Sequence, residues 1–212
     1  DRRYGIGADG VIYLMKSAKS DCRMRLFQPD ESEAEMCGNG IRCLAKFASD
    51  ARYVKESCTV ETLAGPLTVA MEDTEDGFFA TVTMTPPLFD RKDIPATGTG
   101  EYQERIGDYE VYAVNTGVPH AVILVNAVDA IDVAAVAPAI RRHPTFLKGA
   151  NVNFVEKSGE NSFRIRTFER GVEDETLSCG TGATASAAVV HKLGLAGESV
   201  EIETRGGPLT IY

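Results

Sequence analysis

The 212-residue sequence has no long apolar run, no recognisable leader peptide and no excess of positive charge. A membrane-spanning helix needs about 20 consecutive apolar residues, and no such run is found. The first residues do not read as a signal peptide. Lysine and arginine number 22 against 31 aspartates and glutamates, which gives a net charge of −9. That balance argues against DNA or RNA as a partner.

The cysteines also lack the spacing of a disulfide framework or of a zinc site. There are five of them, an odd number, and no Cys-x-x-Cys pair occurs. No combination of histidine and cysteine has zinc-ligand spacing either. This usage favours reduced thiols in a cytoplasmic, reducing compartment. Cys22, Cys43 and Cys58 are interpreted as small core residues.

The other two cysteines, Cys37 and Cys179, have a setting in common. Each is followed by Gly-x-Gly and then by small and apolar residues, in Glu35-Met-Cys-Gly-Asn-Gly-Ile41 and Leu177-Ser-Cys-Gly-Thr-Gly-Ala183. After Cys37 the apolar positions have helical spacing: Ile41, Leu44, Ala45, Phe47 and Ala48. After Cys179 the run is small or apolar nearly all round, which predicts a buried helix ending at Gly194.

Each of these cysteines therefore is expected at the start of a helix. The N–H groups of the first turn and the positive end of the helix dipole lie there. Such a position lowers the pKa of a thiol and offers donors to an anion such as a carboxylate. The glycines allow a ligand to approach the backbone closely.

The duplicated cysteines belong to an internal repeat with an offset of 142 residues. The same offset aligns 60–69 with 202–211, and an offset of 141 aligns Arg23–Phe27 with Arg164–Phe168. The loop that leads to Cys179 is thus one residue longer than its counterpart. Two copies of this length predict two similar domains, placed at 1–93 and 101–212, with linker composition between them.

The remaining pattern predicts an α+β fold in which hairpins supply most of the sheet and each half has one principal helix. Asp132 is expected to cap a short helix that Pro138 interrupts or restarts. Gly5 to Gly10 matches Gly-x-Gly-x-x-Gly, but a strand follows it, so a glycine-rich turn is preferred to a dinucleotide site. Residue 1 aligns with His143, so we expect the natural chain to extend beyond both ends.

Several motifs together resemble those of diaminopimelate epimerase over nearly the whole chain. They are Gly5-Ile-Gly-Ala-Asp9, Asp30-x-Ser-Glu33, Met36-Cys-Gly-Asn-Gly-Ile-Arg-Cys43, Pro119-His120, Asn151-Val-Asn-Phe154, Arg166-Thr-Phe-Glu-Arg-Gly171 and Cys179-Gly-Thr-Gly-Ala183. The resemblance implies two pseudo-symmetric domains, each a mostly antiparallel sheet wrapped around one helix. It implies an isomerase of lysine and cell-wall precursor biosynthesis that interconverts LL- and meso-diaminopimelate without pyridoxal phosphate or another cofactor.

By this resemblance Cys37 and Cys179 are the two catalytic bases, and no metal is expected. One would begin as thiolate and the other as thiol. The substrate-binding positions implied are Gln28, Gly38, Asn39, Asn151, Glu169, Arg170, Gly180 and Thr181, with His120 in support. The expected partner is a small-molecule substrate. A homodimer, in which two identical chains associate, is a further possibility. Val118 stands where the family often has asparagine.

Three other readings use the same cysteines. A proline or hydroxyproline racemase is the related two-cysteine enzyme, although Glu169-Arg170-Gly171 and Ile41-Arg42-Cys43 favour the epimerase. A thiol–disulfide or metal-binding protein belongs to a different class. A catalytically inactive binding relic is the third alternative.

Overall fold

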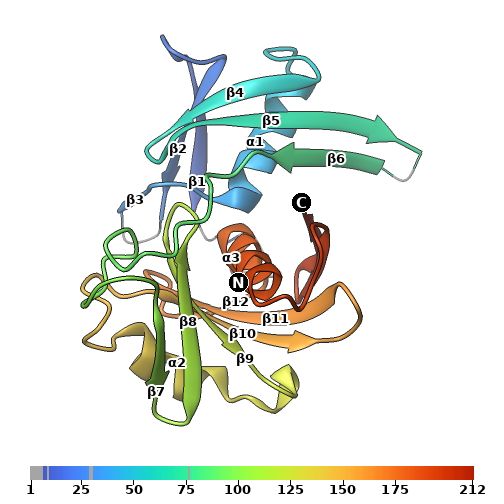
Figure 1. Ribbon diagram of the computed structural model, residues 1–212. Helices are drawn as coiled ribbons and strands as arrows, with labels where there is room; N and C mark the ends of the chain where they lie inside the picture. The colour runs from blue at the N-terminus through green and yellow to red at the C-terminus, as the bar shows by residue number, and fades with distance from the viewer. Residues whose placement is uncertain (1–6, 9, 29–30, 76) are drawn as a thin grey trace. The chain divides into compact units, whose positions relative to one another are not determined.

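The computed structural model describes residues 7–8, 10–28, 31–75 and 77–212. The chain divides into two compact units, Asp1–Met84 and Thr85–Tyr212 (Figure 1). Most of the Gly5–Asp9 motif lies outside the described residues, and so does the start of the glycine-rich turn expected from Gly5 to Gly10. The same holds for Asp30.

The first unit is one sheet with one helix. Its strands have the order β1-β2-β4-β5-β6, and β3 pairs with β2. The elements are β1 (Val11–Met15), β2 (Cys22–Phe27), β3 (Glu33–Ala34), α1 (Gly38–Asp50), β4 (Ser57–Thr62), β5 (Gly65–Thr74) and β6 (Gly77–Val82). Its core contains the buried thiols of Cys22 and Cys58, as the sequence predicted.

The second unit is a larger sheet with the order β14-β13-β11-β10-β9-β8-β7, and β12 pairs with β11. Its elements are β7 (Gln103–Ile106), β8 (Tyr109–Asn115), β9 (Pro119–Leu124), η1 (Val128–Ala130), α2 (Val133–Arg141), β10 (Asn151–Lys157), β11 (Ser162–Glu169), β12 (Asp174–Thr176), α3 (Gly180–Lys192), β13 (Val200–Thr204) and β14 (Gly207–Ile211). Most pairs in both sheets are antiparallel, as expected.

The internal repeat is confirmed by strand pairing. The antiparallel pair β1–β2, the parallel pair β2–β4 and the antiparallel pair β4–β5 recur as β10–β11, β11–β13 and β13–β14. Register is retained as well, because Val11 faces Phe27 and Val152 faces Phe168. Five residues separate Phe27 from its strand partner Glu33, whereas six separate Phe168 from its strand partner Glu175. The extra residue of the second half therefore lies between β11 and β12.

Side chains of alternate residues on β10 point to opposite faces of the second sheet. Val152 and Phe154 belong to one core, which includes residues of α2. Val155 belongs to the other, which includes residues of α3. Asn151 and Asn153 share the face of Val155 and so lie on the α3 side.

The two principal helices are buried to different degrees. In α1 one face is buried through Ile41, Leu44, Ala45 and Ala48, which have the spacing of a single helical stripe. Cys43 is exposed, so its interpretation as a core residue was wrong, and Phe47 of the apolar series is 62% exposed. They lie one turn apart, off that stripe.

Helix α3 is buried over most of its surface, as predicted. It ends at the expected glycine. Gly194 has φ +71°, its N–H donates to the His191 carbonyl at 2.9 Å, and Leu195 N–H donates to the Val190 carbonyl at 2.9 Å. This is the Schellman arrangement, in which a left-handed residue closes the last turn.

One expectation about α2 was confirmed and one was wrong. Asp132 does cap α2, accepting a hydrogen bond from Ala135 N–H at 3.1 Å, but Pro138 lies within that helix and does not interrupt it. Arg142 N–H donates to the Pro138 carbonyl, so the helical turn continues past the proline. A proline removes one helical hydrogen bond without removing its own carbonyl acceptor.

The segment 94–100 is not a linker. Ile94 is 1% exposed and lies in the core of the second unit, and Ala96 bridges to Phe146. Leu88 also bridges to Asn115. The first unit accordingly ends at Met84, earlier than the expected residue 93.

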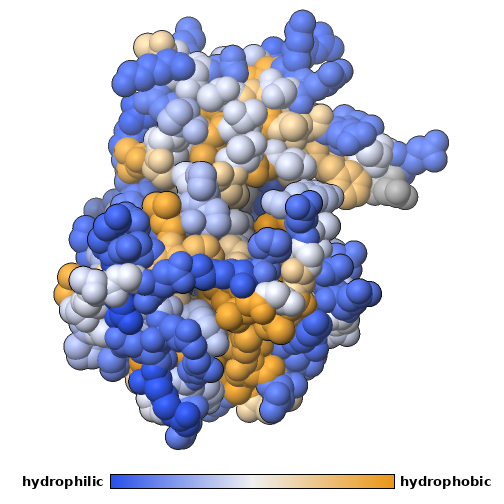
Figure 2. Space-filling view, viewed as in Figure 1, coloured by the Kyte–Doolittle hydropathy of each residue, from blue (hydrophilic) through white to orange (hydrophobic). Residues whose placement is uncertain are grey.

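Hydrophilic residues cover much of the visible face, with hydrophobic patches between them (Figure 2). Among the described residues, no helix has the length and apolar character needed to cross a membrane.

Candidate active site

Cys37 and Cys179 occupy the same position at the start of their helices. Each is the N-cap residue, with extended backbone angles of φ −139° and ψ 114° for Cys37 and φ −126° and ψ 109° for Cys179. Each carbonyl accepts the first helical hydrogen bond at 2.9 Å, from Ile41 N–H and Ala183 N–H respectively. The first-turn N–H groups, which have no carbonyl partner inside the helix, therefore lie beside both sulfurs.

The second glycine of each motif lies against the sulfur. A Cβ at Gly40 would be 3.4 Å from Cys37 Sγ, and one at Gly182 would be 3.3 Å from Cys179 Sγ. The Gly40 N–H donates a hydrogen bond to Cys37 Sγ at 3.3 Å. A Cβ on Gly40 would also meet Ile12 Cδ1 at 2.8 Å, and one on Gly182 would meet Asn153 Oδ1, so these close contacts explain the residue type.

The backbone entering each helix is fixed by the same contact in both units. The carbonyl of Glu35, two residues before Cys37, accepts a hydrogen bond from Ala64 N–H at 3.2 Å. The carbonyl of Leu177 accepts one from Gly206 N–H at 2.7 Å. Both donors lie in the hairpin turn that follows the helix, so the hairpin positions the cysteine.

A bidentate ion pair braces the short strand before each cysteine. Arg25 donates two hydrogen bonds to Glu33, both at 2.8 Å, and Arg166 donates two to Glu175 at 2.7 and 2.6 Å. The hydrogen bonds from Arg25 hold the pKa of Glu33 below its usual value. Planar guanidinium–carboxylate pairs fix orientation as well as charge, so the two loops are built on equivalent supports.

In the second unit a polar network extends from Cys179 into the core. Cys179 Sγ lies 3.4 Å from the Thr181 hydroxyl, which lies 2.9 Å from His120 Nε2. His120 is completely buried. Burial, followed by the nearby charge of Arg170, lowers its pKa from 6.5 to about 3. The imidazole is therefore neutral at physiological pH.

Strand pairing brings the members of this network together. His120 on β9 is directly opposite Asn151 on the parallel strand β10. Asn153 Nδ2 lies 3.0 Å from His120 Nδ1 and donates to the Ala121 carbonyl at 3.1 Å, and Asn153 Oδ1 accepts from the Thr167 hydroxyl. The sequence analysis missed Asn153. Its spacing of two from Asn151 was the available signal, because it places both amides on one face.

Asn151 connects the network to the loop after β11. Its Oδ1 accepts a hydrogen bond from the Arg170 N–H at 2.8 Å. The guanidinium of Arg170 donates to the Lys148 carbonyl at 3.1 Å, and Glu169 accepts from the Thr176 hydroxyl at 2.5 Å. The structure thus brings four predicted residues together within one unit, with His120 hydrogen-bonded to Thr181 and Asn151 to Arg170.

The first unit holds four of the predicted residues. Cys37, Gly38 and Asn39 form the start of α1, where Asn39 Oδ1 accepts a hydrogen bond from Arg42 at 2.6 Å. Gln28 follows β2, and its amide oxygen accepts from the Ser32 hydroxyl at 2.9 Å. Each unit therefore assembles one cysteine with its own set of polar residues.

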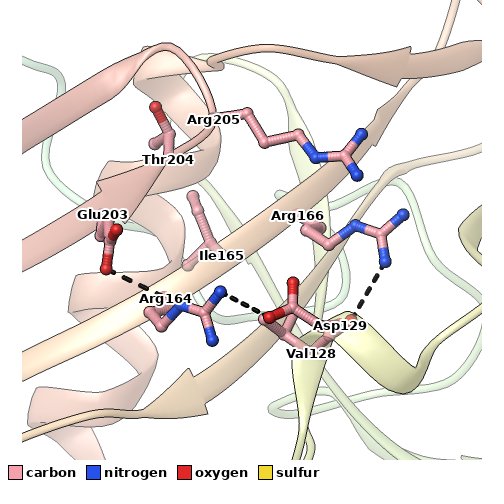
Figure 3. Close-up of a pocket in the computed structure, with 8 residues that line it drawn as sticks. All are labelled: Val128, Asp129, Arg164, Ile165, Arg166, Glu203, Thr204 and Arg205. Carbon is pink, nitrogen blue, oxygen red and sulfur yellow. Dashed lines mark hydrogen bonds and ion pairs between the residues drawn. The ribbon is translucent and has the colours of Figure 1, made fainter.

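A separate pocket in the second unit has a different character. Figure 3 shows its lining by arginine and acidic side chains, with Arg164 paired to Asp129 at 2.6 Å. Arg166 donates to the Val128 carbonyl at 3.1 Å, and Arg205 pairs with Glu175 at 3.2 Å. None of the predicted site residues lines it. Because its guanidinium groups already contact acceptors, the pocket is an ion-pair network and not a second copy of the cysteine site.

Comparison with known proteins agrees with the motifs and their geometry. The family model described as diaminopimelate epimerase matches residues 1–89 and 112–212. The chain belongs to the diaminopimelate epimerase family. The diaminopimelate epimerase of Methanothrix thermoacetophila is 56% identical over 99% of this chain and 75% of its own length. That of Archaeoglobus fulgidus is 45% identical, again over 99% of this chain and 75% of its own length.

Solved structures share the epimerase fold at low sequence identity. A probable proline racemase from Agrobacterium radiobacter superposes with a TM-score of 0.69 at 17% identity, covering 95% of this chain and 66% of that one. A PhzF-family phenazine biosynthesis protein from Bacillus anthracis has a TM-score of 0.69 at 19% identity, covering 97% and 76%. At these identities the likeness establishes the fold alone, and it confirms the predicted two-unit α+β architecture.

Proposed function

We propose that this epimerase-family protein interconverts LL- and meso-2,6-diaminopimelate by proton transfer at the α-carbon, in lysine and cell-wall precursor biosynthesis. The observation that carries the proposal is the duplicated setting of Cys37 and Cys179, each an N-cap residue with a glycine against its sulfur. Family membership and the curated relatives named diaminopimelate epimerase support the substrate.

The proposed chemistry is two-base proton transfer without a cofactor. One cysteine, as thiolate, removes the α-proton from one face of the substrate, and the other, as thiol, delivers a proton to the opposite face. The substrate leaves with inverted configuration, and the two sulfurs exchange protonation states. Thiolates suit this task because a helix start and nearby donors bring their pKa near working pH.

The carbanion formed at the α-carbon requires stabilisation by donors placed in advance. We assign this role to the helix-start N–H groups of Gly38, Asn39, Gly180 and Thr181, which are suited to a substrate carboxylate. Gln28, Asn151, Glu169 and Arg170 are proposed to contact the remaining polar groups of the substrate, with His120 in support. A diamino dicarboxylate offers ammonium and carboxylate groups for all of them.

The second candidate is a proline or hydroxyproline racemase. The solved neighbours that favour it include a hydroxyproline epimerase from Agrobacterium vitis, at a TM-score of 0.68 and 19% identity. Glu169-Arg170-Gly171 and the identities of 45–56% to the archaeal relatives favour the epimerase instead. An inactive binding relic is the non-enzymatic alternative.

Hydrogen exchange at the α-carbon separates these candidates. The intact protein is incubated in D₂O with LL-diaminopimelate, with D-proline or without substrate, and deuterium incorporation is followed by NMR. We expect exchange and epimerisation with diaminopimelate alone. Exchange with D-proline alone would support the racemase, and exchange with neither would support the relic.

Cysteine variants test the mechanism in the same assay. Cys37→Ala and Cys179→Ala should each abolish epimerisation, because each removes one of the two proton carriers. Cys43→Ala is the matched control, since Cys43 lies in α1 with an exposed side chain and has no proposed role. Near-normal turnover by either Cys37→Ala or Cys179→Ala would contradict the two-base mechanism.

We also propose a cytoplasmic location and a homodimer. All five cysteines are thiols in the structure, which suits a reducing compartment. Fractionation of cells that produce the protein tests the location, and light scattering coupled to size-exclusion chromatography tests the assembly. Recovery in a membrane or secreted fraction, or the mass of a single chain, would contradict these proposals.

A further inference from the structure

The network behind Cys179 has a defined hydrogen-bond direction. The starting point is Asn153, whose amide orientation is fixed by a neighbouring backbone carbonyl. Its Nδ2 donates to the Ala121 carbonyl, which can only accept, and its Oδ1 accepts from the Thr167 hydroxyl. The Asn153 group that faces His120 Nδ1 at 3.0 Å is therefore an N–H donor.

This donor determines the tautomer of His120. A hydrogen on Nδ1 would point at the Asn153 amide hydrogen, so Nδ1 must carry a lone pair. A neutral imidazole has one N–H, which then lies on Nε2. A doubly protonated ring would repeat the conflict at Nδ1, and the lowered pKa of this buried histidine agrees with the neutral form.

The Nε2–H group has an acceptor at a good distance. Thr181 Oγ1 lies 2.9 Å from it, whereas Asn151 Nδ2 lies at 3.5 Å, the outer limit for a hydrogen bond. His120 thus donates to the Thr181 oxygen. The hydroxyl hydrogen of Thr181 remains available, and Cys179 Sγ lies 3.4 Å away.

We propose that Asn153 and His120 are positioning residues that hold the Thr181 hydroxyl as a hydrogen-bond donor to Cys179 Sγ, and so stabilise its thiolate. A hydroxyl donates strongly to an anionic sulfur and weakly to a neutral thiol, so a fixed donor favours the charged form. His120 acts here as a neutral relay of hydrogen-bond direction and not as a base.

Two positions of the first unit that correspond to members of this network carry other residues. Ile12 replaces Asn153 beside the motif glycine, where a Cβ on Gly40 would meet Ile12 Cδ1 at 2.8 Å. Asn39 replaces Thr181 and is hydrogen-bonded to Arg42. The repeat therefore provides the same helix start to both cysteines, but Asn153 and Thr181 of the relay are not repeated at these two positions. The residues beside the two cysteines thus differ at these positions even though the backbones match.

Titration of Cys179 tests the effect on the sulfur. In a Cys37→Ser, Cys43→Ser background of the intact protein, the pH dependence of Cys179 alkylation by iodoacetamide is followed by mass spectrometry. Thr181→Val should move the titration to higher pH by roughly one unit, a tenfold loss of thiolate at a fixed pH. Thr181→Ser keeps the hydroxyl and should leave the titration near that of the parent. Equal titrations for the valine and serine variants would overturn the proposal.

Ring nitrogen NMR tests the direction of the relay. The protein has three histidines, so His120 can be assigned in ¹⁵N-histidine-labelled protein by comparison with His143→Gln and His191→Gln. We expect the neutral Nε2–H tautomer of His120 between pH 5 and 8. A protonated Nδ1, alone or in a charged ring, would overturn the proposal. The inference rests on the proposed acid–base role of Cys179, but neither measurement needs turnover, so its failure is separable from loss of epimerase activity.

Discussion

Arg52 and Gly194 occupy equivalent positions of the repeat, each just after the last turn of its helix, and both have left-handed backbone angles, with φ of 59° and 71°. The same pair of hydrogen bonds closes both ends. Arg52 N–H donates to Ser49 and Tyr53 N–H to Ala48 in the first unit, as Gly194 and Leu195 donate in the second. The first unit thus keeps the same helix-end geometry, although it has arginine where the second unit has the more favourable glycine.

This relationship predicts a stabilising substitution. A residue with a Cβ is strained in the left-handed region by about 1 kcal/mol, and glycine is not. Arg52→Gly should raise the free energy of unfolding of the protein by roughly 0.5–1 kcal/mol after the entropy of the unfolded glycine is counted. Arg52→Ala is the control and should give no such gain. Urea unfolding measures both, and an Arg52→Gly protein less stable than wild type would contradict the prediction.

The converse substitution should destabilise the second unit. Gly194→Ala introduces a Cβ at φ +71° without nearby atoms to clash with, so its cost is the backbone strain less the entropy of the unfolded glycine, roughly 0.5–1 kcal/mol. The measurement is the urea midpoint of the variant against wild type. An unchanged midpoint would show that α3 ends differently in solution.

The glycines beside the sulfurs should be far less tolerant. Gly182→Ala would place a Cβ against Asn153 Oδ1 and 3.3 Å from Cys179 Sγ, so the helix start must shift. A displacement near 1 Å at a reacting group costs about 10²-fold in rate, and we expect kcat/KM for diaminopimelate to fall by that order. Gly197→Ala is the control, because its Cβ would meet only Asn161 Oδ1 at 3.6 Å. Equal activity of these two variants would contradict the proposed geometry.

Much of this arrangement was predictable from local sequence. The two Cys-Gly-x-Gly motifs and the repeat offset predicted both helix starts, the paired strands and the longer second loop, because each depends on residues close in the chain. The relay behind Cys179 was not predictable, since it depends on the parallel pairing of β9 with β10. A non-local strand pair brings His120 to Asn153, and only its register says which residues meet.

The errors had equally physical causes. Cys43 was assigned to the core because a lone cysteine is usually a small core residue, but four other residues already fill the buried face of α1. The segment 94–100 has glycine and threonine like a linker, yet Ile94 provides an apolar side chain to the core of the second unit. Whether a side chain is buried depends on the elements that pack against it, and the composition of its own segment does not describe them.

The loop that carries Glu169 and Arg170 is held by Glu173. Its carboxylate pairs with Arg141 at 2.7 Å and Arg142 at 2.6 Å and accepts from Gly171 N–H at 3.2 Å. Burial raises the pKa of Glu173, but the backbone and arginine hydrogen bonds outweigh it and leave the pKa below its usual value.

Weakening this anchor should lower activity through the position of the loop. Glu173→Gln removes the charge that both arginines share, so kcat/KM for diaminopimelate should fall by about tenfold while the fold is retained. Glu160→Gln, in the hairpin between β10 and β11, is a control for the loss of one negative charge. Wild-type kinetics in Glu173→Gln would show that the ion pairs do not position the loop.

Buried, neutral His120 should make stability depend on pH between about 6.5 and 3. Its pKa is about 3 in the native state and near 6.5 when unfolded, so over this range the unfolded chain binds a proton that the native state excludes. The stabilisation is complete above pH 6.5 and is lost as the pH falls, by up to about 1.4 kcal/mol per pH unit.

The test compares wild type with His120→Gln at pH 7.0 and 5.5 by urea unfolding. Glutamine cannot be protonated, and its amide can still donate toward Thr181 from a position near that of Nε2. The stability that wild type loses between these pH values should exceed the loss in the variant by about 1 kcal/mol. His143, His191 and the carboxylates are common to both proteins, so their titrations cancel in the difference. Parallel pH profiles for the two proteins would mean that His120 takes up its proton in the native state, contrary to its complete burial in the structure.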